Sequence, residues 1–454
     1  MAFNLVSTCL VFLILFIHNS PSLVCAQPFD YPTAKLSTTW INDPSAPHSV
    51  QFGDGSTVRA ILIRGTLGQR FACGFYCNGK CDSYLLAIFL VQTNSASMIV
   101  SPTVSFPQVV WSANRDHPVK INATLKLTSD GDLVLRDADG SVAWSTKTAG
   151  KSVAGLALTD TGNLVLHSKR KAVVWQSFDH PTDALVPGQT LTDGQKLISS
   201  VSKTDSRVSI YSFLVNDEGV FAYIQSNPPQ NYYTNYVTTS EQSKKPSYVK
   251  FLNGSLGIYP HSWKQAPLEI FAIPPASSVQ YMRLEFDGHL RVYEWKEKWK
   301  VIADLLTGFS GKCTYPLVCG KYGICSSGKC SCPGLSSSGV QYFREVQEKH
   351  PNLGCAEITP LNCSASKYQD LLELKDVDYF SSNNFTMSNI DVKTCKSACV
   401  KDCSCKAAIF RDGPDPPSRE CLLLSEVFSL QVHDPKDTEN KLTAYLKVQK
   451  KAIK

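Results

Sequence analysis

Apolar and polar residues alternate in short runs over most of the first 310 residues, and tight polar turns separate the runs. The two clearest copies follow one another: Leu125–Asp137 reads LKLTSDGDLVLRD, and Leu156–Ser168 reads LALTDTGNLVLHS. A period of two residues is typical of half-buried β-strands, and Asp-Gly or Gly-Asn between two such runs is typical of a hairpin turn. Each copy therefore predicts a β-hairpin.

Looser copies of the same pattern recur downstream, at Phe213–Tyr223, Tyr248–Tyr259 and Met282–Trp295. Helical periodicity is scarce in this part of the chain. A strand–turn–strand unit that recurs every few tens of residues predicts a repeat-built, mainly β architecture.

The pattern changes after Gly311. The segment Cys313–Cys332 is rich in turns and cysteine and too short to bury a sizeable core, so crosslinks must hold it. Asp391–Val400 is the best helix candidate, with Asp391 as N-cap and Cys395 and Cys399 four residues apart on one face. A last strand is expected at Leu442–Val448.

Length and charge narrow the function little. A chain of 454 residues suggests two to four domains, and Lys plus Arg exceed Asp plus Glu by 45 − 39 = 6. The excess is mild and scattered, which favours a solvated surface over attraction to acidic polysaccharide or a membrane surface. No motif predicts nucleic-acid binding.

The N-terminus has the features of a secretory signal peptide over residues 1–26. Leu10–Ile17 is an apolar core, and Val24-Cys25-Ala26 supplies small residues for cleavage. An uncleaved anchor is the alternative, but the apolar run is short for a membrane span. No later stretch is long and apolar enough for one, so we expect a secreted protein without a membrane span.

Cysteine usage agrees with an oxidising compartment. Beyond Cys9 and Cys25, fifteen cysteines remain as candidates for disulfides: Cys73, Cys77, Cys81, Cys313, Cys319, Cys325, Cys330, Cys332, Cys355, Cys363, Cys395, Cys399, Cys403, Cys405 and Cys421. The first three leave one spare, which either bonds another chain or reaches a distant cysteine. No histidine follows them at ligand spacing, so no metal is expected. Four sequons predict N-glycosylation, at Asn122, Asn253, Asn362 and Asn384.

Two tryptophan motifs and the cysteine array together resemble a known family. Trp111–Val119 reads WSANRDHPV, and Trp175–Asp183 reads WQSFDHPTD. Both resemble signatures of plant S-domain proteins, which are the S-locus glycoproteins and the extracellular parts of G-type (bulb-type) lectin receptor kinases. The CGKYGIC block at Cys319–Cys325 resembles their EGF-like module, and the cysteines of Cys395–Cys405 resemble their PAN/apple module. Among these proteins, the chain is most similar to the epidermis-specific secreted glycoproteins, which have no kinase.

The resemblance covers roughly residues 45–448 and implies a mainly β fold. Tandem bulb-type lectin β-prism domains would occupy residues 27–170 and 171–310. An EGF-like module at 311–356 and a PAN/apple domain at 357–450 would follow. Six of the later cysteines fall in each small module, and no pairing is assigned.

The family's mannose site needs Gln-x-Asp-x-Asn-x-Val-x-Tyr on one strand face, where polar groups bind vicinal sugar hydroxyls. The first hairpin places Thr128, Asp130, Asp132, Val134 and Arg136 at these positions. The second places Thr159, Thr161, Asn163, Val165 and His167 there. The candidate carbohydrate-binding residues are therefore Asp130, Asp132, Val134, Asn163 and Val165. Because each copy changes three of five positions, we expect a degenerate site, with Asp130 and Asn163 acting as turn residues.

Other candidate sites have simpler structural interpretations. Trp111, Trp144 and Trp175 could stack on sugar rings, but they sit in apolar runs typical of a core. The EGF-like block lacks an acidic pair ahead of Cys313 for calcium, which favours a rigid spacer. The Asp179-His180 pair could suggest acid–base chemistry, but it lies in a proline-containing turn where Asp and Pro form the bend.

No catalytic motif occurs in the sequence, so neither an enzyme nor a cofactor is predicted. The first functional hypothesis is recognition of carbohydrate or cell-wall glycan in the apoplast. The alternative is protein–protein recognition, with a protein ligand, a receptor or a second copy of the chain as partner.

Overall fold

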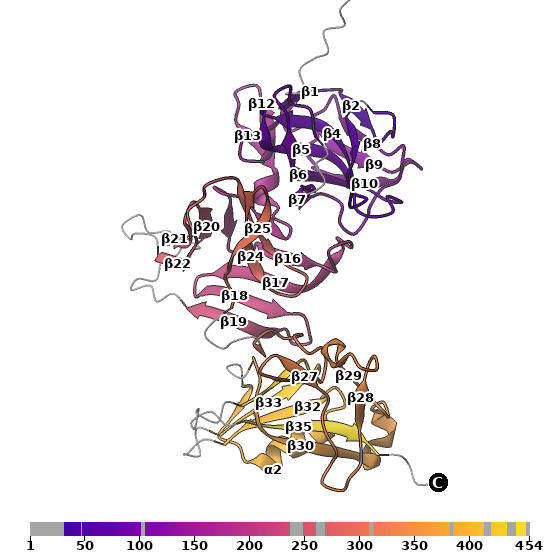
Figure 1. Ribbon diagram of the computed structural model, residues 1–454, viewed down its shortest axis with the longest axis vertical. Coiled ribbons are helices and arrows are strands. Elements are labelled where there is room, and N and C mark those ends of the chain that lie inside the picture. The colour runs from indigo at the N-terminus through magenta and orange to yellow at the C-terminus, as the bar shows by residue number, and fades with distance from the viewer. Residues whose placement is uncertain are drawn as a thin grey trace, which may run out of the picture.

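The computed structural model describes residues 31–46, 48–100, 105–236, 248–259, 268–307, 313–381, 385–412, 419–433 and 442–450. The predicted signal peptide and the Asn384 sequon lie outside these ranges. The described chain forms three units arranged in a row along the long axis, with the N-terminal unit at one end and the C-terminal unit at the other (Figure 1). The fold is mainly β, as the alternating pattern predicts.

The first unit is a β-prism in which three sheets surround one core, with strand orders β1-β11-β12-β13, β10-β9-β8-β2 and β3-β4-β5-β6-β7. Its strands are β1 (Thr33–Lys35), β2 (Thr39–Ile41), β3 (Ser49–Gln51), β4 (Thr57–Arg64), β5 (Gly68–Cys77), β6 (Leu85–Thr93), β7 (Gln108–Ser112), β8 (Thr124–Leu127), β9 (Leu133–Arg136), β10 (Val142–Ser145), β11 (Val153–Leu158), β12 (Leu164–Ser168) and β13 (Val173–Gln176).

The two hairpins predicted from the opening repeats are present as β8–β9 and β11–β12. Leu125 and Leu135 are cross-strand partners and bury their side chains, whereas Lys126 and Arg136 face solvent. The turn glycine of the second hairpin, Gly162, has φ +82°, and a Cβ there would lie 2.6 Å from the ring of Phe71. The turn therefore needs glycine both for its backbone conformation and for close packing.

The five-stranded sheet is buried on both faces. One face joins the prism core, and the other covers a second cluster that contains Phe52, Val58, Phe89 and Val91. Burial on both faces explains why Leu85–Val91 is a continuous apolar run instead of an alternating one.

Three tryptophans gather beside the prism core, one from each sheet. Trp111, Trp144 and Trp175 meet edge to face, with ring centroids 5.8 to 6.0 Å apart. Such contacts add stability beyond the area that they bury. Trp111 also donates from Nε1 to the carbonyl of His180 at 2.8 Å, so the cluster anchors the chain as it leaves the prism.

The second unit is also a three-sheet prism, with strand orders β14-β23-β24-β25, β15-β20-β21-β22 and β16-β17-β18-β19. A short 3-10 helix, η1 (Ser177–Asp179), precedes it. Its strands are β14 (Ala184–Leu185), β15 (Thr190–Thr192), β16 (Lys196–Ser200), β17 (Val208–Asn216), β18 (Gly219–Ile224), β19 (Gln230–Tyr236), β20 (Tyr248–Leu252), β21 (Ser255–Tyr259), β22 (Leu268–Ala272), β23 (Gln280–Leu284), β24 (Leu290–Lys296) and β25 (Lys298–Asp304).

The boundary between the prisms lies later than the expected division at residue 170. Strand β13 pairs with β12 and so belongs to the first prism, although the sequence division assigns it to the second. The reason is that β13 carries Trp175 into the tryptophan cluster. The second prism begins after the turn that contains Asp179 and His180.

The third unit combines the EGF-like and PAN-like segments through one eight-stranded sheet, of order β27-β26-β34-β30-β35-β32-β33-β31. Its elements are β26 (Ile324–Ser326), β27 (Lys329–Ser331), β28 (Phe343–Glu345), η3 (Pro351–Leu353), β29 (Cys355–Glu357), η4 (Cys363–Tyr368), β30 (Gln369–Asp378), β31 (Met387–Ser388), α2 (Val392–Lys401), β32 (Ala407–Arg411), β33 (Glu420–Leu424), β34 (Leu430–Val432) and β35 (Leu442–Gln449). The expected division at residue 356 therefore cuts a shared sheet, because β26 pairs with β34.

The predicted helix is α2. Asp391 caps it by accepting a hydrogen bond from the backbone N–H of Thr394 at 2.8 Å. Cys395 and Cys399 lie buried on its inner face. Both are disulfide-bonded, to Cys421 and Cys405 respectively, so the helix is fixed to the sheet covalently as well as by packing.

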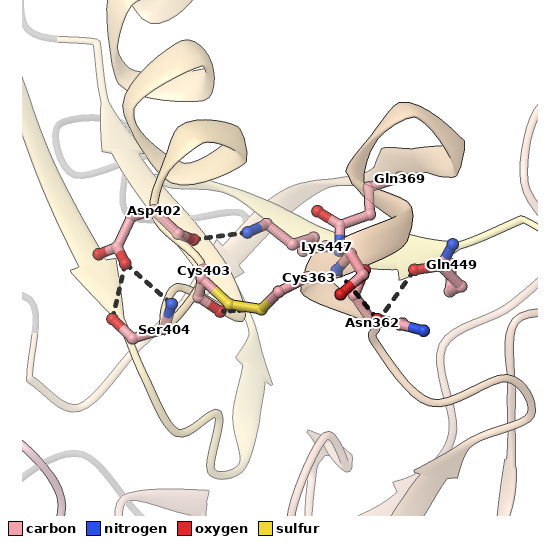
Figure 2. The surroundings of a disulfide bond; sticks show 9 residues. Asn362, Cys363, Gln369, Asp402, Cys403, Ser404, Lys447 and Gln449 are labelled. Carbon is pink, nitrogen blue, oxygen red and sulfur yellow. Dashed lines mark hydrogen bonds between the residues drawn. A yellow bond between two sulfur atoms is a disulfide. The ribbon is translucent and has the colours of Figure 1, made fainter.

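The cysteines of the third unit pair only within the two sets of six. The EGF-like pairs are Cys313–Cys325, Cys319–Cys330 and Cys332–Cys355, and the PAN-like pairs are Cys363–Cys403, Cys395–Cys421 and Cys399–Cys405. Figure 2 shows Cys363–Cys403, which links η4 to the segment just after α2. Beside it, Lys447 on β35 donates to the carbonyl of Asp402 at 2.7 Å.

Among the early cysteines, Cys77 bonds Cys81 and Cys73 is unpaired. Cys73 is thus not a disulfide cysteine, in contrast to its inclusion among the candidates. Its side chain points from β5 into the prism core and is 1% exposed. This burial raises the pKa of the thiol to about 12. A bond from Cys73 to another chain would require the core to open.

Arg115, from the WSANRD motif, joins the two prisms. Its guanidinium donates to the carbonyls of Ser206 and Ile198 at 2.7 and 2.8 Å and to the hydroxyl of Ser200 at 3.0 Å. All three acceptors lie on or beside the β16–β17 hairpin of the second prism. The arginine is 7% exposed, so these bonds are shielded from water.

We expect Arg115→Met to lower the free energy of unfolding by about 3 kcal/mol, because charge-assisted bonds are lost and buried carbonyls are left unpaired. The measurement is chemical denaturation, supported by faster tryptic cleavage at the exposed Lys203 and Arg207 of the hairpin. Arg136→Met is the matched control, since exposed Arg136 makes one bond, to the carbonyl of Gly140 at 3.0 Å. Equal stability of the two variants would contradict the role assigned to Arg115.

A second prediction concerns Glu294 on β24, whose side chain is 1% exposed. Burial alone would raise its pKa, but hydrogen bonds from Lys296 and from the Ser277 hydroxyl and N–H outweigh burial and lower the pKa from 4.5 to about 2. The stabilisation is therefore complete above about pH 4.5 and is lost as the pH falls towards 2.

Glu294→Gln should consequently be less stable than the wild type at pH 6, and the difference should shrink as the pH falls from 4.5 to 2. Thermal unfolding across this range is the measurement. Exposed Glu297, on the adjacent turn, gives the control Glu297→Gln, for which no such trend is expected. A difference between Glu294→Gln and the wild type that stays constant over this range would refute the prediction.

Candidate functional site

We call the two hairpin segments with the sugar-motif positions, residues 128–136 and 159–167, the mannose-type strands. In the first of them, the Asp132 and Thr128 side chains form hydrogen bonds within the protein. Asp132 Oδ1 accepts from the hydroxyl of Thr146 at 2.8 Å and from the backbone N–H of Thr148 at 3.1 Å. The Thr128 hydroxyl donates to the carbonyl of Asp132 and accepts from its N–H. These bonds tie the β8–β9 turn to the segment after β10, so this carboxylate oxygen serves the fold.

In the second mannose-type strand, the Asn163 side chain likewise forms hydrogen bonds within the protein. Asn163 is 9% exposed and donates from Nδ2 to Gln176 Oε1 at 2.9 Å. Its Oδ1 accepts from the Ser177 hydroxyl at 3.2 Å and from the Phe178 N–H at 3.3 Å. The amide thus holds the start of η1 against the hairpin.

The other candidate positions remain wholly or partly exposed on the two hairpins. Asp130 is exposed at the hairpin tip, and Val134 and Val165 are half-buried on different sheets. Arg136 points to solvent where the sugar motif requires tyrosine. The structure therefore places the five candidate residues on two separate hairpins, with the Asp132 and Asn163 side chains engaged in hydrogen bonds within the protein.

A cavity of about 500 Å³ lies instead between the two prisms. We call it the inter-prism cleft. The first prism contributes the β3–β4 turn, the segment after β5 and residues Phe106–Val109. The second contributes the β16–β17 hairpin, β23 and the start of the β23–β24 turn. Its volume falls within the range of small-molecule sites in proteins.

Aromatic and charged side chains of the second prism line one wall. The rings of Tyr281 and Tyr293 stack with centroids 4.9 Å apart and an interplanar angle of 8°. The Tyr293 hydroxyl donates to Glu285 Oε1 at 2.7 Å, and the Arg283 guanidinium lies over the Tyr281 ring at 4.9 Å. Burial, with Glu285 nearby, raises the pKa of Tyr293 well above its usual value, so its hydroxyl stays protonated.

The two prisms touch directly at this wall. The Tyr281 hydroxyl donates to Gln108 Oε1 at 2.7 Å, and Arg283 donates from Nη2 to the carbonyl of Val109. At another point of the cleft, Asn78 Nδ2 donates to the carbonyl of Lys203 at 2.9 Å. The cleft is thus a space between two contacts, and its shape depends on both prisms.

The first-prism wall supplies Tyr76 and Asp54. Burial raises the pKa of Tyr76 to about 12, with the Asp54 carboxylate adding to the effect. Asp54 is exposed and uses Oδ1 to accept from the N–H and hydroxyl of Ser56. The cleft therefore combines aromatic faces with hydroxyl donors and carboxylate acceptors, which is the chemistry that sugar rings require.

Two family models match the chain: one described as D-mannose binding lectin, over residues 108–207, and one described as PAN-like domain, over residues 363–427. EP1-like glycoprotein 2 of Arabidopsis thaliana is 30% identical over 382 residues, covering 74% of this chain and 79% of that protein. The chain belongs to the EP1-like glycoprotein family of plant S-domain proteins.

Two further relatives are similar to different shares of the chain. The epidermis-specific secreted glycoprotein EP1 of Daucus carota is 32% identical over 277 residues, covering 52% of this chain and 70% of that glycoprotein. A G-type lectin S-receptor-like serine/threonine-protein kinase of Arabidopsis thaliana is 28% identical, and the match spans 88% of this chain but 44% of the kinase. The chain thus spans less than half the length of that receptor kinase relative.

Within this EP1-like protein, the described ranges contain no helix long and apolar enough to cross a membrane. The same ranges contain no group of three or more His, Cys, Asp or Glu arranged to hold a metal ion. Ahead of the EGF-like segment, Asp304 at the end of β25 bonds with His289 and Arg291 and accepts from the hydroxyl of Tyr315, so its carboxylate serves the junction between the second prism and the third unit.

Sequence reasoning missed the inter-prism cleft, because its walls come from segments far apart in the chain. Tyr76 and Tyr281 are separated by about half of the sequence, and no local pattern predicts that they meet. One signal was present, since Arg115 belongs to the WSANRD motif and lines the cleft. The motif fixes the joint that creates the cavity.

We expect Asn163→Ala to lower the free energy of unfolding by about 1–3 kcal/mol, because it leaves buried partners unpaired. Asp130→Ala is the matched control on the other hairpin and should change it by less than about 0.5 kcal/mol. Urea denaturation of both variants is the measurement. A neutral effect of Asn163→Ala would show that the residue is not structural.

Proposed function

We propose that this EP1-like glycoprotein is a secreted, non-catalytic protein that recognises carbohydrate of the plant cell wall through its lectin-like prisms. The observation that carries the proposal is the match to the D-mannose binding lectin model over residues 108–207, in a chain that builds two consecutive prisms. Because the Asp132 and Asn163 side chains bond within the protein, we do not assign the ligand to the mannose position.

Several features support an extracellular location. The third unit holds six disulfides within the described residues, which fits an oxidising compartment. Three sequon asparagines, Asn122, Asn253 and Asn362, are exposed on loops or turns and are proposed as glycosylation sites. The relative from carrot is itself named a secreted glycoprotein. We therefore propose that the protein is located in the apoplast or the cell wall.

Protein–protein recognition is the second candidate function. It is favoured by the PAN-like match over residues 363–427, because PAN modules pair proteins. In this chain the unit packs its sheet against α2 and is closed by three disulfides. The partner would be a protein ligand, a receptor or a second copy of the chain. This function predicts that the protein binds no glycan. For a partner that is a second copy of the chain, it also predicts that the molecular mass measured in solution increases with protein concentration.

The test of the proposed function is a glycan array that includes cell-wall oligosaccharides, probed with glycosylated protein secreted from plant cells. We expect binding to a restricted set of glycans that free sugar competes away. Mannose binding that Asp130→Ala abolishes would show instead that the degenerate strand is functional. Absence of binding to every glycan, together with a self-associating or partner-bound species on sizing chromatography, would favour protein recognition.

A further inference from the structure

We infer that the inter-prism cleft is the ligand site of this chain and that it binds an uncharged sugar as part of a short oligosaccharide. The inference rests on the proposed carbohydrate recognition and goes further by naming the site and the charge of its ligand. Both prisms supply walls of the cleft, so neither prism alone would form the site.

The charges that line the cleft balance. It contains three carboxylates and three cationic groups: Asp54, Asp183, Glu285, Arg115, Lys203 and Arg283. The cations are also largely engaged, because Arg115 bonds the β16–β17 hairpin and Arg283 bonds the carbonyl of Val109. A balanced set of charges offers strong hydrogen-bonding groups without attracting an anion or a cation, which favours a neutral, polyhydroxylated ligand.

One donor in the cleft has no acceptor. Arg283 Nε is buried and makes no hydrogen bond within the described chain, although its Nη2 bonds Val109 and its guanidinium stacks on Tyr281. An unpaired buried N–H is costly, and a small shift of the Arg283 side chain towards the cleft would let a ligand oxygen satisfy it. A sugar hydroxyl can accept from this N–H and donate to a nearby carboxylate such as Glu285 at the same time.

Apolar ring faces complete the site. Tyr76, Phe106 and Phe286 line the cleft beside the Tyr281–Tyr293 stack. The C–H face of a sugar ring packs on such rings, while its hydroxyls reach the polar groups around them.

The experiment fills the cleft and leaves the mannose-type strand intact. Ser83 is exposed and lines the cleft, so Ser83→Trp should occupy the space that the ligand needs. Ser129 is exposed in the β8–β9 turn, next to the mannose-type positions, and Ser129→Trp is the matched control. For the best glycan on the array, titration calorimetry should show loss of detectable binding for Ser83→Trp and an unchanged affinity for Ser129→Trp.

A finer variant tests the hydrogen bonding. Glu285→Gln keeps Oε1 as the acceptor for Tyr293 but removes the charge, and should weaken binding by about tenfold. Glu218→Gln, exposed in the β17–β18 turn, should have no effect. Comparing a neutral oligosaccharide with its uronic-acid counterpart tests the charge, and we expect the neutral one to bind more tightly.

The outcomes separate the two proposals. If the wild type binds no glycan, the proposed function fails. If it binds and Ser83→Trp binds equally well while retaining the wild-type melting temperature, the function stands and the cleft is not the site. If only Ser129→Trp loses binding, the ligand site is the mannose-type strand and the cleft proposal is wrong. If the uronic-acid oligosaccharide binds more tightly than the neutral one, the proposal of an uncharged ligand is wrong.

Discussion

The buried guanidinium of Arg115 is the constraint on which the arrangement of the two prisms depends. It reaches from the end of β7 into the second prism and satisfies two backbone carbonyls and one hydroxyl there. A planar group with five N–H donors suits this task, because it can bond several acceptors in fixed directions at once. Since the acceptors belong to the hairpin that forms one wall of the cleft, the same contact sets the shape of the cavity.

The tryptophan cluster stabilises the connection between the two prisms as well, because Trp111 bonds the carbonyl of His180. Trp175 contacts Trp111 and Trp144 and also stacks on the ring of His180 at 5.3 Å. The two tryptophan motifs, which resemble family signatures in the sequence, thus form a core cluster and the connection between the prisms. The family resemblance that they carry therefore concerns how consecutive prisms are joined.

The third unit is stabilised differently from the prisms. Each prism has a large apolar core, whereas the EGF-like segment has only a small cluster of its own, made mainly of cysteines, and packs its buried Tyr322 and Phe343 into the core of the PAN-like strands. It is held by disulfides and by sharing a sheet with the PAN-like strands, through the pairing of β26 with β34. Contacts such as the Tyr379 hydroxyl to Gln230 at 2.6 Å then fix this unit against the second prism. Crosslinks replace core volume where the segment is too short to provide it.

The sequence by itself determined the local structure. Alternation and turn glycines predict the hairpins, and the Asp391 cap with paired cysteines predicts α2, because these features depend on neighbours a few residues apart. The sequence could also show that Asp132 and Asn163 stand in degenerate sugar motifs. It could not show that their side chains bond Thr146 and Gln176, that β13 belongs to the first prism, or that Cys73 is the unpaired cysteine. Only the tertiary structure decided these points and formed the inter-prism cleft, because its walls come from residues that folding brings together from distant parts of the chain.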